Sequence, residues 1–170
     1  MPTYKALSLH FLPETKSMPL ESLLSFLHIA SVTIWVGGMF FAYACLRPAA
    51  AALLEPAQRL RLWRAVFGRF FVWVWIAIAL ILASGLAMLL QLGFAAAPRN
   101  WHLMLTSGLV MIAIFAYVYA GPYAALVRAV EAEDWKAGGA ALGRIRQAVG
   151  INLALGVLTI AVATLGRLIA

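Results

Sequence analysis

The sequence predicts an all-α integral membrane protein, a bundle of four helices with little material outside the bilayer. Of its 170 residues, 65% are hydrophobic, whereas soluble domains usually contain about 45–50%. Only 11% are charged, and these residues gather between four apolar runs. Each run is long enough to supply the roughly 20 residues that cross the hydrocarbon layer. Backbone groups in lipid find no water, so each run must close its own hydrogen bonds as a helix.

The chain is expected to divide into a short leading segment and one membrane domain. Residues 1–19 lack the continuous apolar core of a cleaved signal peptide, so we expect a periplasmic or interfacial segment there. Residues 20–170 form the four-helix domain. Its spans are expected at about residues 20–46, 66–92, 101–127 and 144–168.

Two proline positions shape the predicted helices. Arg47-Pro48 is expected to end the first span, because the residue before a proline leaves helical space. A polar connection would then run to about residue 65. Gly121-Pro122 is expected to kink or loosen the last turns of the third span.

The basic residues predict the orientation. Nine of the 13 Lys and Arg residues lie in or beside the connections that follow the first and third spans. Loops rich in Lys and Arg stay in the cytoplasm, so both termini are expected to be periplasmic and the protein to lie in a bacterial inner membrane. The same placement explains the net charge of +7 by contact with membrane lipid, and no basic stripe is left to bind nucleic acid.

Two histidines are the main candidates for chemistry. His28 lies in the first span and His102 at the start of the third, and these two spans run in the same direction. Both side chains are therefore expected in the periplasmic half of the bundle. An ionisable residue within a span is a functional hypothesis by default, and histidine is the commonest metal ligand. Either histidine could equally be a satisfied structural residue.

Other side chains could support a metal or a cofactor. Ser31, Trp35 and Met39 share one helical face with His28. The thioether of Met39 suits Cu(I), although ordinary packing explains it as well. Arg99 and Arg167 are expected at the periplasmic level, where they would hold haem propionates or contact lipid head groups.

Several segments together resemble one family. Residues 27–41 read LHIASVTIWVGGMFF, residues 143–146 read GRIR and residues 151–153 read INL. With RFF at residues 69–71, they resemble the bacterial copper resistance protein D (CopD) family. A histidine followed by Trp-x-Gly-Gly is also similar to the membrane protoporphyrinogen oxidase family called HemJ.

The resemblance to CopD implies copper handling at the inner membrane, with His28 as the first candidate ligand of a copper ion and His102 as the second. It also implies periplasmic copper-binding proteins or redox partners, and a possible homo-oligomer, because longer family members have additional spans. The alternative is a b-type haem protein for electron transfer or oxidoreduction, with the two histidines as axial ligands. A third reading is a scaffold in which both histidines only pack.

Overall fold

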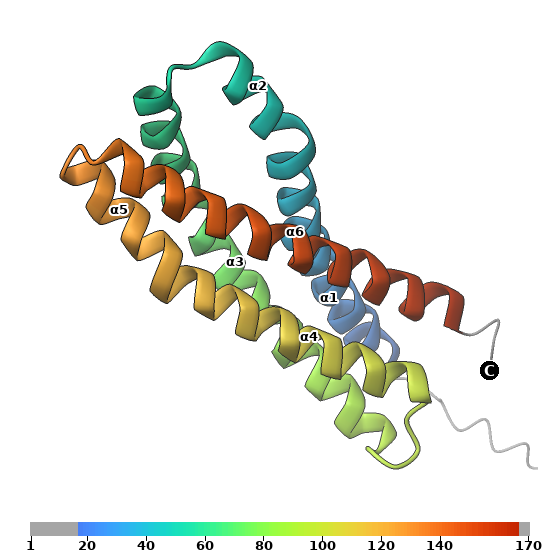
Figure 1. The fold of residues 1–170 in the computed structure, drawn as a ribbon. Helices are drawn as coiled ribbons and strands as arrows, with labels where there is room; N and C mark the ends of the chain where they lie inside the picture. Colours follow the sequence, from blue (N-terminus) through green and yellow to red (C-terminus); the bar gives the residue numbers. More distant parts are fainter. Residues whose placement is uncertain (1–16, 167–170) are drawn as a thin grey trace, which may run out of the picture.

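The computed structural model describes residues 17–166, with side chains from residue 20 onward. Every regular element in this part of the chain is a helix (Figure 1). In order, the elements are α1 (Ser17–Phe40), η1 (Phe41–Leu46), α2 (Arg47–Leu53), α3 (Pro56–Leu92), α4 (Arg99–Val118), η2 (Tyr119–Tyr123), α5 (Ala124–Glu131) and α6 (Trp135–Leu165). The prediction of an all-helical fold is confirmed.

Four continuous helices are long and apolar enough to cross a membrane, as the sequence predicts. They cover Leu20–Leu53, Pro56–Leu92, Arg99–Glu131 and Trp135–Leu165. Their lengths of 31 to 37 residues exceed the roughly 20 that a bilayer requires. The membrane-embedded limits and the orientation therefore stay predictions.

The prediction that the first helix ends at Arg47-Pro48 is wrong. The helix continues through the π-helical turns of η1 and through α2 to Leu53. A proline inside a helix removes one N–H and presses against the carbonyl one turn earlier. The wider π-helical turns immediately before Pro48 change that spacing, and the helix continues past the proline.

The predicted loosening at Gly121-Pro122 is confirmed. Residues Tyr119–Tyr123 form the second π-helical segment, η2, and Pro122 lies inside it. The helix resumes as α5 and ends at Glu131. In both membrane helices that contain an internal proline, helical structure thus continues through a local change of helix type.

The polar connections are much shorter than the sequence suggests. Helix α3 begins at Pro56, where Glu55 and Gln58 form a reciprocal capping box. Helix α6 begins after Asp134, whose carboxylate accepts from the backbone N–H of Ala137 at 2.9 Å. These caps stabilise the starts of α3 and α6 well before the apolar runs begin. The arginines of the predicted polar connections therefore lie on helices and not in loops.

The helices pack in two main pairs. α1 packs chiefly against α3, and α4 and α5 pack against α6. Figure 1 shows the α2–α3 and α5–α6 connections at one end of the bundle, which we call the arginine-rich end. The start of α1, the α3–α4 connection and the end of α6 lie at the opposite end.

Large apolar side chains cover the outside of the bundle. Exposed examples occur on every long helix and include Phe26, Val72, Leu109 and Leu158. An apolar exterior of this kind suits contact with lipid chains, not with water. The interior contains a separate cluster, with Trp35, Phe67, Phe71, Phe115 and Leu126 among its buried members.

Candidate functional site

His28 is held between α1 and α3. Its Nδ1 lies 3.1 Å from the hydroxyl oxygen of Ser84. The Ser84 hydroxyl donates its hydrogen to the carbonyl of Leu80 at 2.5 Å, so its oxygen is the acceptor for His28. With the Ser84 hydrogen given to Leu80, the Nδ1–H tautomer of His28 satisfies this contact, and in that tautomer Nε2 keeps the lone pair that a metal ion requires.

A glycine on α3 makes room for the His28 ring. A Cβ atom at Gly85 would lie 3.1 Å from Cε1 of His28, closer than most real contacts of this kind. Ser84 thus forms a hydrogen bond with the imidazole ring, and the neighbouring Gly85 leaves the space that the ring occupies. Neither residue is among the candidates predicted from the sequence, although a Ser-Gly pair inside an apolar run is a signal that could have indicated them.

His102 has different surroundings from His28. Its Nδ1 donates to the carbonyl of Pro98 at 3.3 Å, within the first turn of α4. Its ring contacts the edge of Phe94 in the α3–α4 connection, with 4.8 Å between the ring centres. His28 instead contacts α3, so the contacts described for the two histidines do not join them in one site.

The face of α1 that continues from His28 turns into the core. Ser31, Trp35 and Met39 are all buried, with at most 4% of each exposed. The indole of Trp35 meets Phe115 edge-on at 6.1 Å. Met39 follows His28 by 11 residues, about 16 Å along the helix, so its sulfur lies too far away to contact the same ion.

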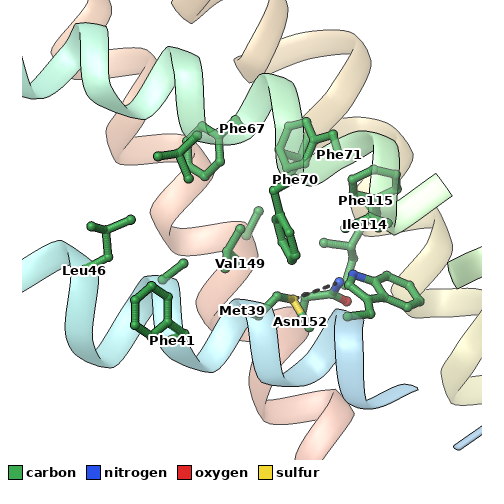
Figure 2. Close-up of a pocket in the computed structure, with 17 residues that line it drawn as sticks. Met39, Phe41, Leu46, Phe67, Phe70, Phe71, Ile114, Phe115, Val149 and Asn152 are labelled. Atoms are coloured by element: carbon green, nitrogen blue, oxygen red, sulfur yellow. Dashed lines mark hydrogen bonds between the residues drawn. The ribbon is translucent and has the colours of Figure 1, made fainter. Parts of the chain in front are cut away.

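A pocket of about 150 Å³ lies beside Met39 (Figure 2). Its walls come from α1, η1, α3, α4 and α6, and the rings of Phe67, Phe70, Phe71 and Phe115 line much of it. Gly38 lies on its wall, and the Phe70 ring occupies the space that a Cβ at Gly38 would need. A glycine thus lets this ring approach α1.

Asn152 of α6 contributes an amide group to this pocket. Its Nδ2 donates to the sulfur of Met39 at 3.8 Å, which joins α6 to α1 by the kind of interhelical contact that asparagine makes in membrane spans. Its Oδ1 is buried and has no hydrogen-bond partner among the described residues. Buried polar atoms almost always have a partner, so this oxygen requires an explanation.

The arginine-rich end holds a second, larger hollow. It has a volume of about 430 Å³ and lies between α3 and α5, where Arg61, Arg64, Arg69 and Tyr123 line it. Arg61 forms an ion pair with Glu133 at 2.9 Å. Arg64 forms a second ion pair, with Glu131.

The remaining predicted residues stay apart from both pockets. Arg99 is exposed at the first residue of α4, and Arg167 lies outside the described residues. Neither histidine lines either of the two pockets described above, and among residues 17–166 no group of three or more His, Cys, Asp or Glu side chains could hold a metal ion. Nothing in this geometry favours the haem alternative, which stays a prediction from the sequence.

The sequence matches the family described as Copper resistance protein D (CopD) over residues 64–165, more than half of the chain. This stretch contains His102, Ser84 and Asn152, whereas His28 and Met39 precede it. Comparisons with curated proteins and with solved structures find no match. With four apolar helices of membrane-spanning length, the chain is a multi-pass membrane protein and belongs to the copper resistance protein D family.

Proposed function

We propose that this protein handles copper in a bacterial inner membrane and that Nε2 of His28 contacts the ion. Membership of the copper resistance protein D family supports the copper connection. The hydrogen bond between His28 and Ser84 is the observation that supports His28 as the residue that contacts copper. No other histidine in the described part of the chain is held between two membrane helices.

The hydrogen bond from Nδ1 is the arrangement expected of a metal-binding histidine. Such residues nearly always donate their second ring N–H to a fixed acceptor, which sets the tautomer and the orientation of the ring. Ser84 has this role here, because its own hydrogen is given to Leu80. Imidazole nitrogen is also a suitable ligand for copper.

A single imidazole from one chain suits transient contact with copper better than storage. An ion that crosses a membrane must bind strongly enough to enter and weakly enough to leave. A second copy of the chain or a periplasmic copper-binding protein would complete the coordination during transfer, because the described contacts do not place His102 beside His28. Met39 is proposed as a separate, deeper position because of its distance along α1.

The test is nitrogen NMR of the detergent-solubilised protein with labelled histidines, titrated with Ag(I). Ag(I) is a diamagnetic ion with the charge and softness of Cu(I). We expect Nε2 of His28 to shift while Nδ1 keeps its bond to Ser84. His28→Ala should remove the shifting signal, and Met39→Leu should leave the His28 shift intact.

Ser84→Ala separates the role of the hydrogen bond from that of the ring. Loss of a partner that orients a ligand typically lowers metal affinity by about 10–100-fold, and we expect an effect in this range. Thr33→Ala is the matched control, since the Thr33 hydroxyl bonds only within α1, to the carbonyl of Ile29. An unshifted His28 at saturating Ag(I), or equal effects of Ser84→Ala and Thr33→Ala, would contradict the proposal.

A further inference from the structure

The pocket beside Met39 combines a hollow with an unsatisfied acceptor. Asn152 is only 3% exposed, and its Oδ1 has no partner among the described residues. Its Nδ2 is committed to the Met39 sulfur, which fixes the amide and leaves the oxygen as the free group. A buried amide oxygen without a partner costs free energy, so a bound donor here would be favoured.

Water is a poor occupant of this pocket. A buried water molecule typically makes about three hydrogen bonds and needs at least two polar partners. Apart from the Asn152 amide, the walls are aliphatic and aromatic side chains, the Met39 thioether and the indole of Trp35. Besides the Asn152 amide, a water here could pair only with the indole N–H of Trp35, so it would fall short of the usual three hydrogen bonds.

The size and the walls of the pocket indicate a single aromatic ring. Its volume is about 150 Å³, and an apolar cavity of about this size in another protein accepts benzene. Phe67, Phe70 and Phe71 offer ring faces and edges, which favour offset-stacked and edge-on contacts with another ring. Figure 2 shows these rings and the Asn152 amide around the same space.

The pocket reaches the outer surface of the bundle at η1. Phe41, the first residue of this π-helical segment, lines the pocket and is 59% exposed. A molecule dissolved in the lipid would therefore meet the pocket from the side, without crossing an aqueous phase. The copper contact proposed at His28 lies elsewhere on α1 and does not take part, whereas Met39, proposed as a separate copper position, lines this pocket.

We propose that this pocket binds a membrane-dissolved phenol, with its ring among the phenylalanines and its hydroxyl donating to Oδ1 of Asn152. The hydroxyl supplies the donor that the amide oxygen lacks, and the ring fills the apolar volume. A ring without a donor would fill the same space and leave the oxygen unsatisfied. Selectivity for the hydroxyl is therefore the signature of the site.

Fluorine NMR with 4-fluorophenol and 4-fluorotoluene tests this directly. The two probes are nearly identical in shape, and only the first can donate a hydrogen bond. Each is titrated into the full chain in detergent micelles, and empty micelles correct for partitioning. We expect 4-fluorophenol to bind about tenfold more tightly, as one buried hydrogen bond implies.

Two variants, each with a matched control, locate the effect. Asn152→Leu should abolish the preference for the phenol, whereas Thr159→Val, on the same helix and outside the pocket, should keep it. Ala148→Leu should fill the pocket and weaken both probes, whereas Ala154→Leu, on the exposed side of α6, should not. Equal binding of the two probes by the wild-type chain, or binding that survives Ala148→Leu, would overturn the proposal.

Discussion

The bundle is packed loosely around Asn152 and tightly around Gly156, although these two residues lie one turn apart on α6. We call these two regions the hollow level and the tight level. At Asn152 the helices enclose a pocket and leave an amide oxygen without a partner. At Gly156 they touch: an added Cβ would lie 2.9 Å from Val36 of α1 and 3.2 Å from Met111 of α4. The packing thus changes from hollow to tight within four residues.

The difference shows what controls helix association in this protein. Lipid chains are as apolar as the helix surfaces, so little hydrophobic force closes a gap between membrane helices. Close contact must come from side chains that fit. Gly156 provides such a fit by letting backbones approach, whereas the large rings around Asn152 meet without filling the centre. A hollow can therefore persist beside a tight contact.

The largest expected effect is at the tight level. Gly156→Val should lower the free energy of unfolding by about 1–3 kcal/mol, because the new methyl groups have no space between Val36 and Met111. Gly143→Val is the matched control on α6, since nothing lies within 4 Å of a Cβ placed there. Unfolding in mixed detergent micelles with increasing SDS measures both. Similar losses in the two variants would show that α6 responds to side-chain volume anywhere along its length.

At the hollow level around Asn152, a substitution by an apolar residue should raise the free energy of unfolding instead of lowering it. Asn152→Leu removes the unsatisfied oxygen and adds apolar atoms beside the pocket, so stability should rise by about 1 kcal/mol. The loss of the weak N–H to sulfur bond with Met39 offsets only part of this gain. The same SDS unfolding assay, without added phenol, measures the change. A clear loss of stability would mean that the Met39 bond, not the pocket, dominates this level.

Much of the helical architecture could be predicted from the sequence. Four apolar runs and their basic flanks are enough to indicate four membrane helices, because lipid permits almost no other backbone structure. The ends were harder to predict. Pro48 signals a helix end when considered alone, and only the π-helical turns before it explain why the helix continues.

The site could be predicted only in part, because a sequence does not show how helices are rotated about their axes. His28 was identified as a candidate from its type and position, but its partner Ser84 lies 56 residues away. The common face of Ser31, Trp35 and Met39 was visible in the helical spacing, whereas the unsatisfied oxygen of Asn152 depends on three other helices.

A smaller effect is expected where α4 and α6 share a polar contact. The Thr159 hydroxyl lies 2.8 Å from the Ser107 oxygen and also 2.8 Å from the carbonyl of Leu155 in its own helix. Ser107→Ala leaves Thr159 with the second acceptor, so the loss should be about 0.6 kcal/mol, the average for interhelical bonds in membranes. The SDS assay compares it with Thr164→Ala, whose hydroxyl bonds only within α6. A loss as large as that of Gly156→Val would mean that polar contacts rival packing.

The smallest effect is expected at the arginine-rich end, where the ion-paired side chains are exposed. The side chains of Arg61 and Glu133 are 59% and 68% exposed, so their ion pair at 2.9 Å is well screened. Glu133→Gln should change the stability by less than about 0.5 kcal/mol, and the change should shrink as salt is added. Glu131→Gln, which breaks the less exposed pair with Arg64, should have the larger effect of the two. If Glu133→Gln instead matches the loss from Gly156→Val, the charged end contributes as much to holding the bundle together as its tightest contact.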